Sequence, residues 1–171
     1  ITALNKVSFT IQKGETLAIL GKTGSGKSTI LNLISRLYDI KDGEITIDGH
    51  NIKDLNLHDV RNSIAFVPQD AFLFSDTIMN NIKFGKENAT EAEVIEAAKK
   101  AVVHTNIMGF NEQYQTVVGE RGITLSGGQK QRVSIARAII KDSNILLLDD
   151  CLSAVDTETE EAILNNLLEF C

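Results

Sequence analysis

The start of the chain carries the hydrophobic patterns of β-strands. Apolar and polar side chains alternate over residues 7–11 (VSFTI), which predicts a half-buried strand, and residues 16–20 (TLAIL) form a short apolar run, which predicts a strand buried on both faces. The Lys-Gly pair at residues 13–14 predicts a turn between them. A helix is expected over residues 27–36, so this region is predicted to fold as two strands followed by a helix.

Shorter strand patterns follow, and the spacing of the apolar residues then changes. Residues 44–49 (EITIDG) predict a strand that ends in a turn, and residues 64–68 (IAFVP) predict a buried strand that ends at the only proline. Residues 59–62 (DVRN) are expected on a short helix. From Phe72 to about Val103 apolar residues recur every three or four positions. This spacing predicts a helical lobe after the β-rich segment.

Local signals mark where the later elements begin. Thr90 is predicted to be an N-cap, and Glu93 is placed to complete a capping box. Helix is expected again after Ser126, followed by a short apolar strand at residues 145–148 (ILLL) and a last helix over about residues 157–169. No internal repeat or linker interrupts this order.

Composition narrows the class of protein. With 171 residues, 43% of them hydrophobic, the chain is long enough for one domain with a real core, in one or two lobes. The net charge of −6 argues against a nucleic-acid binder with a broad basic face, so any anion site is local. Cys151 and Cys171 form neither a disulfide framework nor a zinc motif, which favours a reducing, cytoplasmic compartment. No apolar stretch approaches the roughly 20 residues that span a bilayer.

The stretch GKTGSGKS, between a predicted strand and a predicted helix, has the residue types of a phosphate-binding loop. Its glycines permit positive φ, so that backbone N–H groups converge on phosphate oxygens, and the helix that follows directs its positive dipole end at them. Lys27 is expected to contact the β and γ phosphates, and Ser28 to bind Mg²⁺. The residues predicted to bind a nucleoside triphosphate here are Gly21, Lys22, Thr23, Gly24, Ser25, Gly26, Lys27, Ser28 and Thr29.

Two acidic residues end the strand predicted at residues 145–148. Asp149, at the carboxyl end of a buried strand, is placed to hold Mg²⁺ directly or through water. Asp150 is the candidate to orient or deprotonate the attacking water. An ordinary solvated turn is the alternative for such a pair, and the phosphate loop in the same chain favours the catalytic interpretation.

A second stretch, LSGGQKQR at residues 125–132, opens a predicted helix with a serine and two glycines. Bare N–H groups at a helix N-terminus are suited to bind phosphate. The chain is therefore predicted to contain two segments that can bind a γ phosphate, and they need not bind the same nucleotide.

With these motifs in this order, the sequence closely resembles the nucleotide-binding domain of ATP-binding cassette (ABC) transporters over nearly its whole length. The phosphate loop matches the Walker A loop, LSGGQ the family signature, Asp149 the Walker B aspartate, and residues 153–156 (SAVD) the D-loop. Gln69, in VPQD, matches the Q-loop glutamine. The resemblance implies ATP as the nucleotide, a catalytic set of Lys27, Gln69 and Asp150, and Mg²⁺ ligands Ser28, Gln69 and Asp149.

The resemblance also implies a fold and an assembly. The expected fold is α/β, a P-loop NTPase with a parallel core sheet, an antiparallel β subdomain and an inserted helical subdomain. The domain would span residues 1–171, with a core lobe of residues 1–71 and 143–171 and a helical lobe of residues 72–142. In the implied head-to-tail dimer, ATP lies between the Walker A loop of one domain and the signature of the other. The signature residues would bind ATP in trans: Ser126, Gly127, Gly128 and Gln129.

Two stretches resemble exporter members of the family: residues 73–85 (LFSDTIMNNIKFG) and residues 116–122 (TVVGERG). The second resembles the loop that contacts the coupling helices of the transmembrane part, while a surface loop with helix packing is the alternative for both. The implied role is an ATP-driven motor on the cytoplasmic face of the cell membrane. Its expected partners are a transmembrane domain, fused or separate, and a second nucleotide-binding domain, with no nucleic acid.

Asp150 departs from the family pattern, in which a catalytic glutamate usually follows the Walker B aspartate. The carboxylate loses about 1.5 Å of reach, and misplacement by about an ångström can cost around 10²-fold in rate, so slow hydrolysis is expected. Cys151 and Leu152 also stand where the family more often has Ala-Thr. This combination resembles the degenerate half of heterodimeric exporters and favours a partner that carries the glutamate. A homodimer that uses Asp150 as a weaker base stays open.

The two ends of the chain also depart from the pattern. The aromatic residue on which the family stacks adenine lies further upstream than this chain reaches, and Phe9 is expected to be a core strand residue. The switch histidine of the family would lie beyond the last residue, whereas His50, His58 and His104 are expected to be surface or packing residues. The chain is therefore interpreted as a fragment whose central sheet lacks a strand. Alone, it is predicted to be unstable, domain-swapped or weak as an ATPase.

Two other functions stay open. A DNA-maintenance ATPase of the same superfamily would separate the Walker A and signature halves by a coiled coil or zinc modules. Neither a sustained heptad nor a cysteine cluster lies between Ser28 and Leu125, which argues against this class. A regulatory clamp that binds nucleotide with little hydrolysis of its own is favoured by Asp150.

Overall fold

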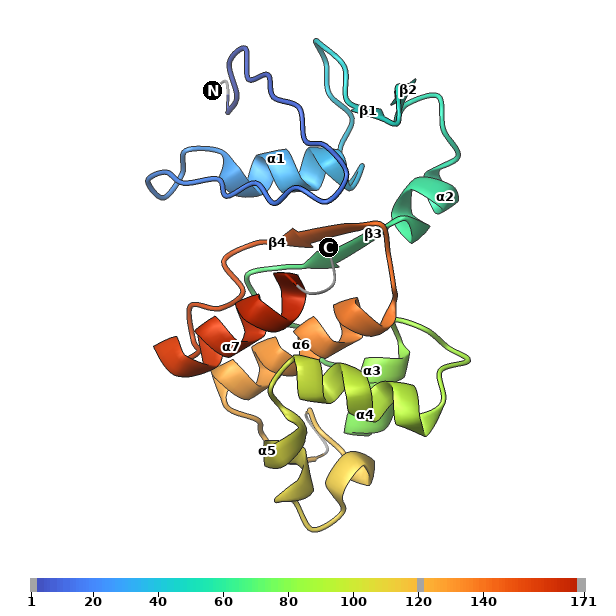
Figure 1. The fold of residues 1–171 in the computed structure, drawn as a ribbon, viewed down its shortest axis with the longest axis vertical. Coiled ribbons are helices and arrows are strands. Elements are labelled where there is room, and N and C mark those ends of the chain that lie inside the picture. Colours follow the sequence, from blue (N-terminus) through green and yellow to red (C-terminus); the bar gives the residue numbers. More distant parts are fainter. Residues whose placement is uncertain (1–2, 120–121, 169–171) are drawn as a thin grey trace. The chain divides into compact units, whose positions relative to one another are not determined.

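The computed structural model describes residues 3–119 and 122–168, and the chain divides into two compact units, one that ends at Ile64 and one that begins at Ala65 (Figure 1). The first unit contains two short helices and a small hairpin. The second contains a pair of longer strands and the remaining helices. The phosphate loop lies in the first unit, and both the acid pair and the signature lie in the second.

Turns are well predicted in the first unit. β1 (Thr46–Ile47) pairs antiparallel with β2 (His50–Asn51), and residues 48–49 between them have φ of 51° and 78°. Two positive φ values match a type I′ turn, whose twist suits a β-hairpin. The strand expected in EITIDG is therefore present but short. The earlier turn is also confirmed, because the backbone N–H of Glu15 donates to the carbonyl oxygen of Gln12 (3.0 Å).

The two strands predicted near the start of the chain are wrong for the part of the chain that the structure describes. Residues 7–11 and 16–20 form no β-ladder with any described residue. Phe9, expected in the core, is 45% exposed, and Leu20 is 91% exposed. An extended segment becomes a strand only where its backbone N–H and C=O groups bond to a neighbouring strand. Hydropathy marks which side chains favour burial but does not supply that neighbour.

Two helices complete the first unit. α1 (Lys27–Ile34) confirms the helix predicted after the phosphate loop, and α2 (Leu57–Asn62) confirms the short one near its predicted place. No residue of α1 is fully buried. Arg36, just beyond α1, donates through Nη1 to the carbonyl oxygens of Ile52 (2.6 Å) and Leu55 (3.0 Å). This arginine fastens the end of α1 to the segment that leads into α2.

A two-stranded sheet forms between β3 (Ile64–Val67), whose first residue ends the first unit, and β4 (Ile145–Leu148) of the second unit, which confirms both predicted strands. The pair is extended at one end by a hydrogen bond from the backbone N–H of Asp149 to the carbonyl oxygen of Val67 (2.9 Å). Most of the helical part of the chain lies between these strands in sequence. The sheet thus brings together the ends of two segments that are distant along the chain.

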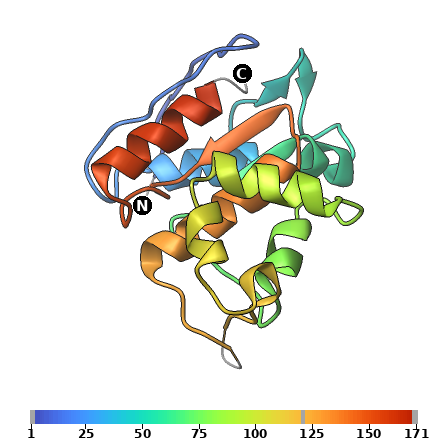
Figure 2. The ribbon, with the colours of Figure 1, turned by 60° about the horizontal axis from the view of Figure 1, so that its bottom comes forward.

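Helices make up the rest of the second unit, with α6 at its centre. They are α3 (Ile78–Lys83), α4 (Glu91–Lys100), α5 (His104–Met108), the short 3₁₀ helix η1 (Gln113–Gln115), α6 (Gly127–Ile140) and α7 (Thr157–Leu168). α6 packs against both α3 and α4 (Figure 2). α7 packs against α4. One hydrophobic core runs through the unit, with Ile135 of α6 and Ile163 of α7 fully buried in it. Residue 169, the expected end of the last helix, lies outside the described residues.

The capping box predicted at the start of α4 is confirmed. The hydroxyl of Thr90 accepts a hydrogen bond from the backbone N–H of Glu93 (3.3 Å), and the Glu93 carboxylate accepts one from the backbone N–H of Thr90 (2.7 Å). Two N–H groups that the helix itself cannot satisfy are thereby bonded, which fixes where α4 begins.

Candidate functional site

The loop of residues 21–28 takes its shape from glycines. Gly24 and Gly26 have φ of 80° and 96°, in the left-handed region that other residues rarely adopt. A Cβ added at Gly26 would lie 2.8 Å from the carbonyl oxygen of Ala3, so this position also lacks room for a side chain. The glycine pattern that predicts a phosphate loop is therefore required by the backbone itself.

Lys27 and the start of α1 give this loop features that suit an anion. The Nζ atom of Lys27 donates to the carbonyl oxygens of Gly21 (2.8 Å) and Lys22 (3.1 Å), which holds the ammonium group over the loop. Gly26 caps α1 without a side-chain hydrogen bond, and α1 has no acidic residue in its first turn. The N–H groups and the positive dipole end of such a helix attract negative charge. We refer to residues 21–29 as the phosphate cradle.

The remaining residues of the predicted phosphate loop lie on the same cradle. The backbone N–H of Ser25 donates to the carbonyl oxygen of Lys22 (3.1 Å), which closes a turn around the exposed residue Thr23. Ser28 and Thr29 lie in the first turn of α1 and are half-buried. The structure thus brings all nine predicted residues onto one short loop and helix start.

The acid pair lies at the end of β4, beside the Q-loop glutamine. The bond between Asp149 and Val67 aligns the ends of β3 and β4. Gln69, which follows β3, donates through Nε2 to Oδ2 of Asp150 at 3.2 Å, across a separation of 81 positions in sequence. Asp149 is half-buried, and both Gln69 and Asp150 are exposed. Two predicted catalytic residues are therefore in direct contact.

Asp150 reaches this contact through an unusual backbone conformation. Its φ of 45° lies in the left-handed region, which costs a residue with a Cβ roughly 1–2 kcal/mol, although aspartate tolerates it better than most. The hydroxyl of Ser153 donates to the carbonyl oxygen of Asp150 (3.1 Å) and supports the turn. The chain therefore turns sharply after β4, with the carboxylate of Asp150 bonded to Gln69.

The signature lies at the start of α6 and caps it. Oγ of Ser126 accepts a hydrogen bond from the N–H of Gln129 (3.2 Å), while Oε1 of Gln129 accepts one from the N–H of Ser126 (2.9 Å). α6 has no acidic residue in its first turn. The two signature glycines, Gly127 and Gly128, place no side chain over the N–H groups at this end. The helix start is therefore a second donor-rich surface, as the sequence predicts.

A partly buried arginine lies next to the signature. Arg132 donates through Nε to the carbonyl oxygen of Gly128 (3.2 Å) and through Nη1 to that of Val102 (2.6 Å). Partial burial lowers the pKa of Arg132. Hydrogen bonds from Thr159 lower the pKa of Asp156, and the charge of Arg132 adds a smaller effect. A cation on the signature helix and an anion at the start of α7 are thus each held by their own hydrogen bonds.

Cys151, one of the departures from the family pattern, fills the core. It is 2% exposed, and burial raises the pKa of its thiol to about 12. The thiol is therefore protonated at neutral pH and does not act as a nucleophile. Cys171, the other cysteine, lies outside the described residues.

Two polar residues of structural importance are missed by the sequence analysis. Asn81, 1% exposed, bonds the backbone of Phe74 in both directions and accepts a hydrogen bond from Nη2 of Arg137 (3.0 Å). Gln131, 6% exposed, accepts one from the backbone N–H of Ala154 (3.2 Å). An asparagine among the apolar residues of TIMNNI was a usable signal, since buried amides need partners. Gln131 follows the signature among other polar residues and gave no such signal.

The histidines have the roles expected of surface and packing residues. Nδ1 of His104 lies 2.9 Å from the hydroxyl of Tyr114, which is itself buried. The side chain of His58 is 80% exposed, and His50 lies exposed on β2. None of them contacts the cradle or the acid pair through a described hydrogen bond.

The predicted Mg²⁺ ligands suit that ion chemically. Among the described residues no group of three or more His, Cys, Asp or Glu side chains is placed to hold a metal. A hydroxyl (Ser28), an amide oxygen (Gln69) and a carboxylate (Asp149) are hard oxygen donors, which Mg²⁺ uses together with phosphate and water. Gln69 and Asp149 follow adjacent strand ends, so two of the three donors come from one edge of the sheet.

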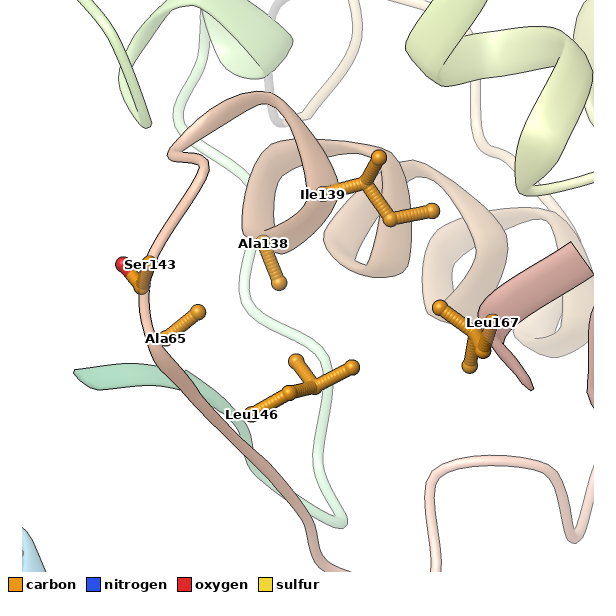
Figure 3. A pocket seen from close by; sticks show the side chains of 6 residues that line it. All are labelled: Ala65, Ala138, Ile139, Ser143, Leu146 and Leu167. Atoms are coloured by element: carbon orange, nitrogen blue, oxygen red, sulfur yellow. The ribbon is translucent and has the colours of Figure 1, made fainter. Parts of the chain in front are cut away.

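A small pocket elsewhere in the second unit carries no acid or base. It lies between the β3–β4 sheet and helices α6 and α7 (Figure 3), and it is lined by Ala65, Ala138, Ile139, Ser143, Leu146 and Leu167. One hydroxyl among apolar groups offers no catalytic pair. A separate finding concerns membranes: within residues 3–119 and 122–168, no helix combines the length and apolar character that crossing a bilayer requires.

Comparison with known proteins gives concordant matches. The family model described as ABC transporter matches residues 4–153. The chain is 50% identical to "ABC transporter B family member 24, mitochondrial" of Arabidopsis thaliana, over 96% of this chain and 24% of that protein. It is 49% identical to "ATP-binding cassette sub-family B member 6" of Xenopus tropicalis, over 98% of this chain and 20% of that protein. A putative multidrug export ATP-binding/permease protein of Staphylococcus aureus is 52% identical over 94% of this chain and 28% of its own length.

A solved structure extends the likeness to three dimensions. The chain matches a bacterial Atm1-family ABC exporter with ATP bound, at 46% identity and a TM-score of 0.89, over 93% of this chain and 28% of that one. The predicted fold class, α/β of the P-loop NTPase type with a parallel sheet and antiparallel strands, is confirmed. The chain spans between a fifth and three tenths of the length of these relatives.

Proposed function

We propose that this chain, which belongs to the ABC transporter family, is the ATP-binding and ATP-hydrolysing motor domain of an exporter. Members of this family are ATPases, and the similar bacterial exporter has ATP bound. The observation that carries the proposal is the phosphate cradle, where glycines at positive φ shape the loop and two loop carbonyls hold the Lys27 ammonium group. Closure of a head-to-tail dimer on Mg-ATP would then drive a substrate across the membrane.

In the proposed site the phosphate cradle binds the triphosphate of ATP. Lys27 exchanges the carbonyl oxygens of Gly21 and Lys22 for β and γ phosphate oxygens, because bonds between two charged groups are stronger. Ser28, Gln69 and Asp149 would hold Mg²⁺, which supplies positive charge that neutralises the phosphates. The N–H groups at the start of α1 add further donors.

Asp150 is proposed to orient or deprotonate the attacking water. Gln69 donates to Oδ2 of Asp150 and restrains the carboxylate, so Oδ1 is the oxygen that would contact the water. The aspartate stands about 1.5 Å short of where a glutamate would reach, and such a displacement can cost around 10²-fold in rate. This shorter reach supports the proposal of slow hydrolysis at this chain's own site.

The signature is proposed to seal the ATP of a partner domain, with residues 126–129 acting in trans. Ser126 and Gln129 satisfy each other inside the chain. A hydroxyl that accepts one hydrogen bond still has its own proton to donate. The Ser126 proton and the N–H groups of Gly127 and Gly128 would therefore serve the γ phosphate of the partner's nucleotide.

An intact signature beside a shortened acid supports a heterodimer. In that assembly the signature of this chain completes the site of a partner that carries the glutamate, while its own Walker site mainly holds ATP. A homodimer in which Asp150 acts as a weaker base is the alternative. The second candidate function, a regulatory clamp with little hydrolysis, is supported by the same aspartate.

The other proposed partner is a transmembrane domain, which would place this chain at the cytoplasmic face of the membrane. The names of relatives include "exporter" and "permease", and the chain spans only part of their length. On the segment of residues 73–85, Phe84 is 68% exposed. Its ring centroid lies 4.6 Å from the ring centroid of Phe74, which in turn lies 5.1 Å from that of Phe72. An exposed aromatic cluster supports docking of another protein part here. The net charge of −6 supports the absence of a nucleic-acid partner.

ATP binding can be tested by replacing Lys27 in the full-length transporter. Lys27→Ala is expected to weaken ATP binding about 10- to 100-fold, because hydrogen bonds to charged groups contribute about 1.5–3 kcal/mol. Lys13→Ala, in an exposed turn, is the matched control and keeps the wild-type affinity. Equilibrium binding of a fluorescent ATP analogue measures both, and equal affinities for Lys27→Ala and wild type would contradict the proposal.

Hydrolysis separates the motor from the clamp. Single-turnover hydrolysis is measured with and without a glutamate-bearing partner domain, and a motor accelerates with that partner whereas a clamp does not. Asp150→Glu restores the missing reach and is expected to raise the single-turnover rate of this chain's own site. An unchanged rate would argue against a geometric defect at Asp150.

A further inference from the structure

One buried amide joins the signature helix to the segment that follows the acid pair. Gln131, in the second turn of α6, is 6% exposed. Its Oε1 accepts a hydrogen bond from the backbone N–H of Ala154 at 3.2 Å, across 23 positions of sequence. Buried amides are kept in proteins where their hydrogen bonds are made. This contact therefore fixes the backbone of the D-loop at its centre.

The same place shows a close approach of two backbones. A Cβ added at Gly128 would lie 2.6 Å from the carbonyl oxygen of Ala154, and one added at Gly127 would lie 3.5 Å from its Cβ. The first turn of α6 and the D-loop are thus packed without intervening side chains. A shift of one backbone must displace the other, because close-packed interiors transmit displacement.

The D-loop is tied just as closely to the catalytic acid. Ser153 donates from Oγ to the carbonyl oxygen of Asp150 (3.1 Å), and the N–H of Val155 donates to the carbonyl oxygen of Leu152 (3.0 Å). Cys151, between Asp150 and the D-loop, is buried in the core at 2% exposure. Residues 150–155 therefore form a short, internally bonded turn with little freedom to move independently.

We propose that Gln131 is a positioning residue for ATP hydrolysis: it fastens the D-loop to the signature helix, so that the helix that seals a partner's nucleotide and the carboxylate of Asp150 move as one body. The inference rests on the proposed function and adds a link between the two sites of the dimer. When the signature engages ATP in trans, the displacement of α6 reaches Asp150 through Ala154 and Ser153. In this proposal Gln131 acts through the D-loop and has no contact with the nucleotide.

The test uses the full-length transporter together with its second nucleotide-binding domain. Gln131→Met keeps the length of the side chain and removes the strong acceptor, and it is expected to lower kcat at saturating ATP about tenfold, a fraction of the loss that a full ångström of misplacement causes. The KM for ATP changes by less than about twofold, because the phosphate cradle and the signature surface are intact. Gln131→Glu retains an acceptor oxygen at the same place and is expected to restore most of kcat.

Two further variants make the result decisive. Gln12→Met, at an exposed position of the first unit, is the matched control and keeps the wild-type kcat. Ser153→Ala removes the bond to Asp150 from the other end of the same link and is expected to lower kcat about threefold with unchanged KM. If Gln131→Met fails to fold, as judged by loss of ATP binding, Ser153→Ala decides the question.

The possible outcomes divide clearly. A wild-type kcat in Gln131→Met, or equal losses in Gln131→Met and Gln131→Glu, overturns the inference, as does a KM that rises in step with the fall in kcat. These results leave the proposed function standing, because the wild-type protein still binds and hydrolyses ATP. Failure of the wild-type protein to bind ATP overturns the proposed function instead.

Discussion

The two units of the chain hold their candidate sites in different ways. In the unit that ends at Ile64, few residues are buried and α1 buries none, so the phosphate cradle depends on glycine φ values and on the two hydrogen bonds of Lys27. In the unit that begins at Ala65, the signature opens a helix that is buried along most of its length in a continuous core. One site is shaped by local backbone chemistry and the other by packing. Each should therefore respond to a different kind of mutation.

Removal of a buried side chain should produce the largest difference in stability loss between the two units. Ile135→Ala, at a position 1% exposed in α6, is expected to cost about 2–5 kcal/mol, as buried Ile-to-Ala changes do. Ile30→Ala, on half-buried α1, is the matched control and is expected to cost about 1 kcal/mol, because less transfer energy is lost. Hydrogen exchange of the α6 and α1 amides in the full-length protein measures both, and equal losses would remove the contrast.

A glycine substitution should instead have its largest effect in the first unit, at the phosphate cradle. Gly26→Ala places a Cβ against the Ala3 carbonyl at a φ of 96°, and left-handed strain plus the clash are expected to cost about 2–3 kcal/mol and to abolish ATP binding. Gly43→Ala meets the same positive φ with nothing within 4 Å, so it should cost about 1 kcal/mol and leave ATP binding intact. Thermal unfolding with and without ATP compares the two. Similar behaviour of the pair would mean that space at Gly26 is not limiting.

Loss of a cap should have a moderate effect. Ser126→Ala removes the acceptor for the N–H of Gln129 and is expected to destabilise the start of α6 by about 1 kcal/mol. Ser126→Gly should destabilise it by only about a few tenths of a kcal/mol, since glycine is tolerated at N-caps. Exchange rates of the first-turn amides of α6 measure the difference. No change in either variant would show that packing alone fixes this helix start.

The smallest effect concerns pH and the capping box of α4. A hydrogen bond from Lys86, with further bonds from Thr90, lowers the pKa of Glu93 from 4.5 to about 2. Because the folded pKa is the lower one, the box stabilises the folded state fully above pH 4.5 and loses this contribution as pH falls toward 2. First-turn amides of α4 should therefore lose protection between these pH values. Glu93→Gln should abolish that dependence, and α1, which has no acidic residue in its first turn, should not show it.

Much of the fold could be predicted because its signals are local. Thr90 and Glu93 mark the start of α4, and the apolar run of β4 marks a strand, in each case through neighbouring residues alone. The strands expected over residues 7–11 and 16–20 failed for the opposite reason. Their hydropathy is right, but a ladder needs a partner from elsewhere in the chain or assembly, and no described residue supplies one.

In the candidate site, too, local features could be predicted and contacts between residues distant in sequence could not. The backbone of the phosphate cradle, a glycine loop followed by a helix, could be predicted because the glycine spacing and Lys27 lie within one short segment. The contact between Gln69 and Asp150 spans 81 positions and was not predicted. The family resemblance named both residues as catalytic, but nothing in the spacing pairs an amide with a carboxylate. Gln131 was not found at all, since its role appears only when the D-loop folds back on α6.

The buried thiol of Cys151 has a practical use. With a pKa raised to about 12 and 2% exposure, it should be silent toward maleimide reagents as long as the turn after Asp150 stays closed. In a Cys171→Ser variant, the rate at which Cys151 is labelled would then measure how often that turn opens during the ATP cycle. The labelled residue would be a cysteine that the sequence already contains, so no cysteine would have to be introduced.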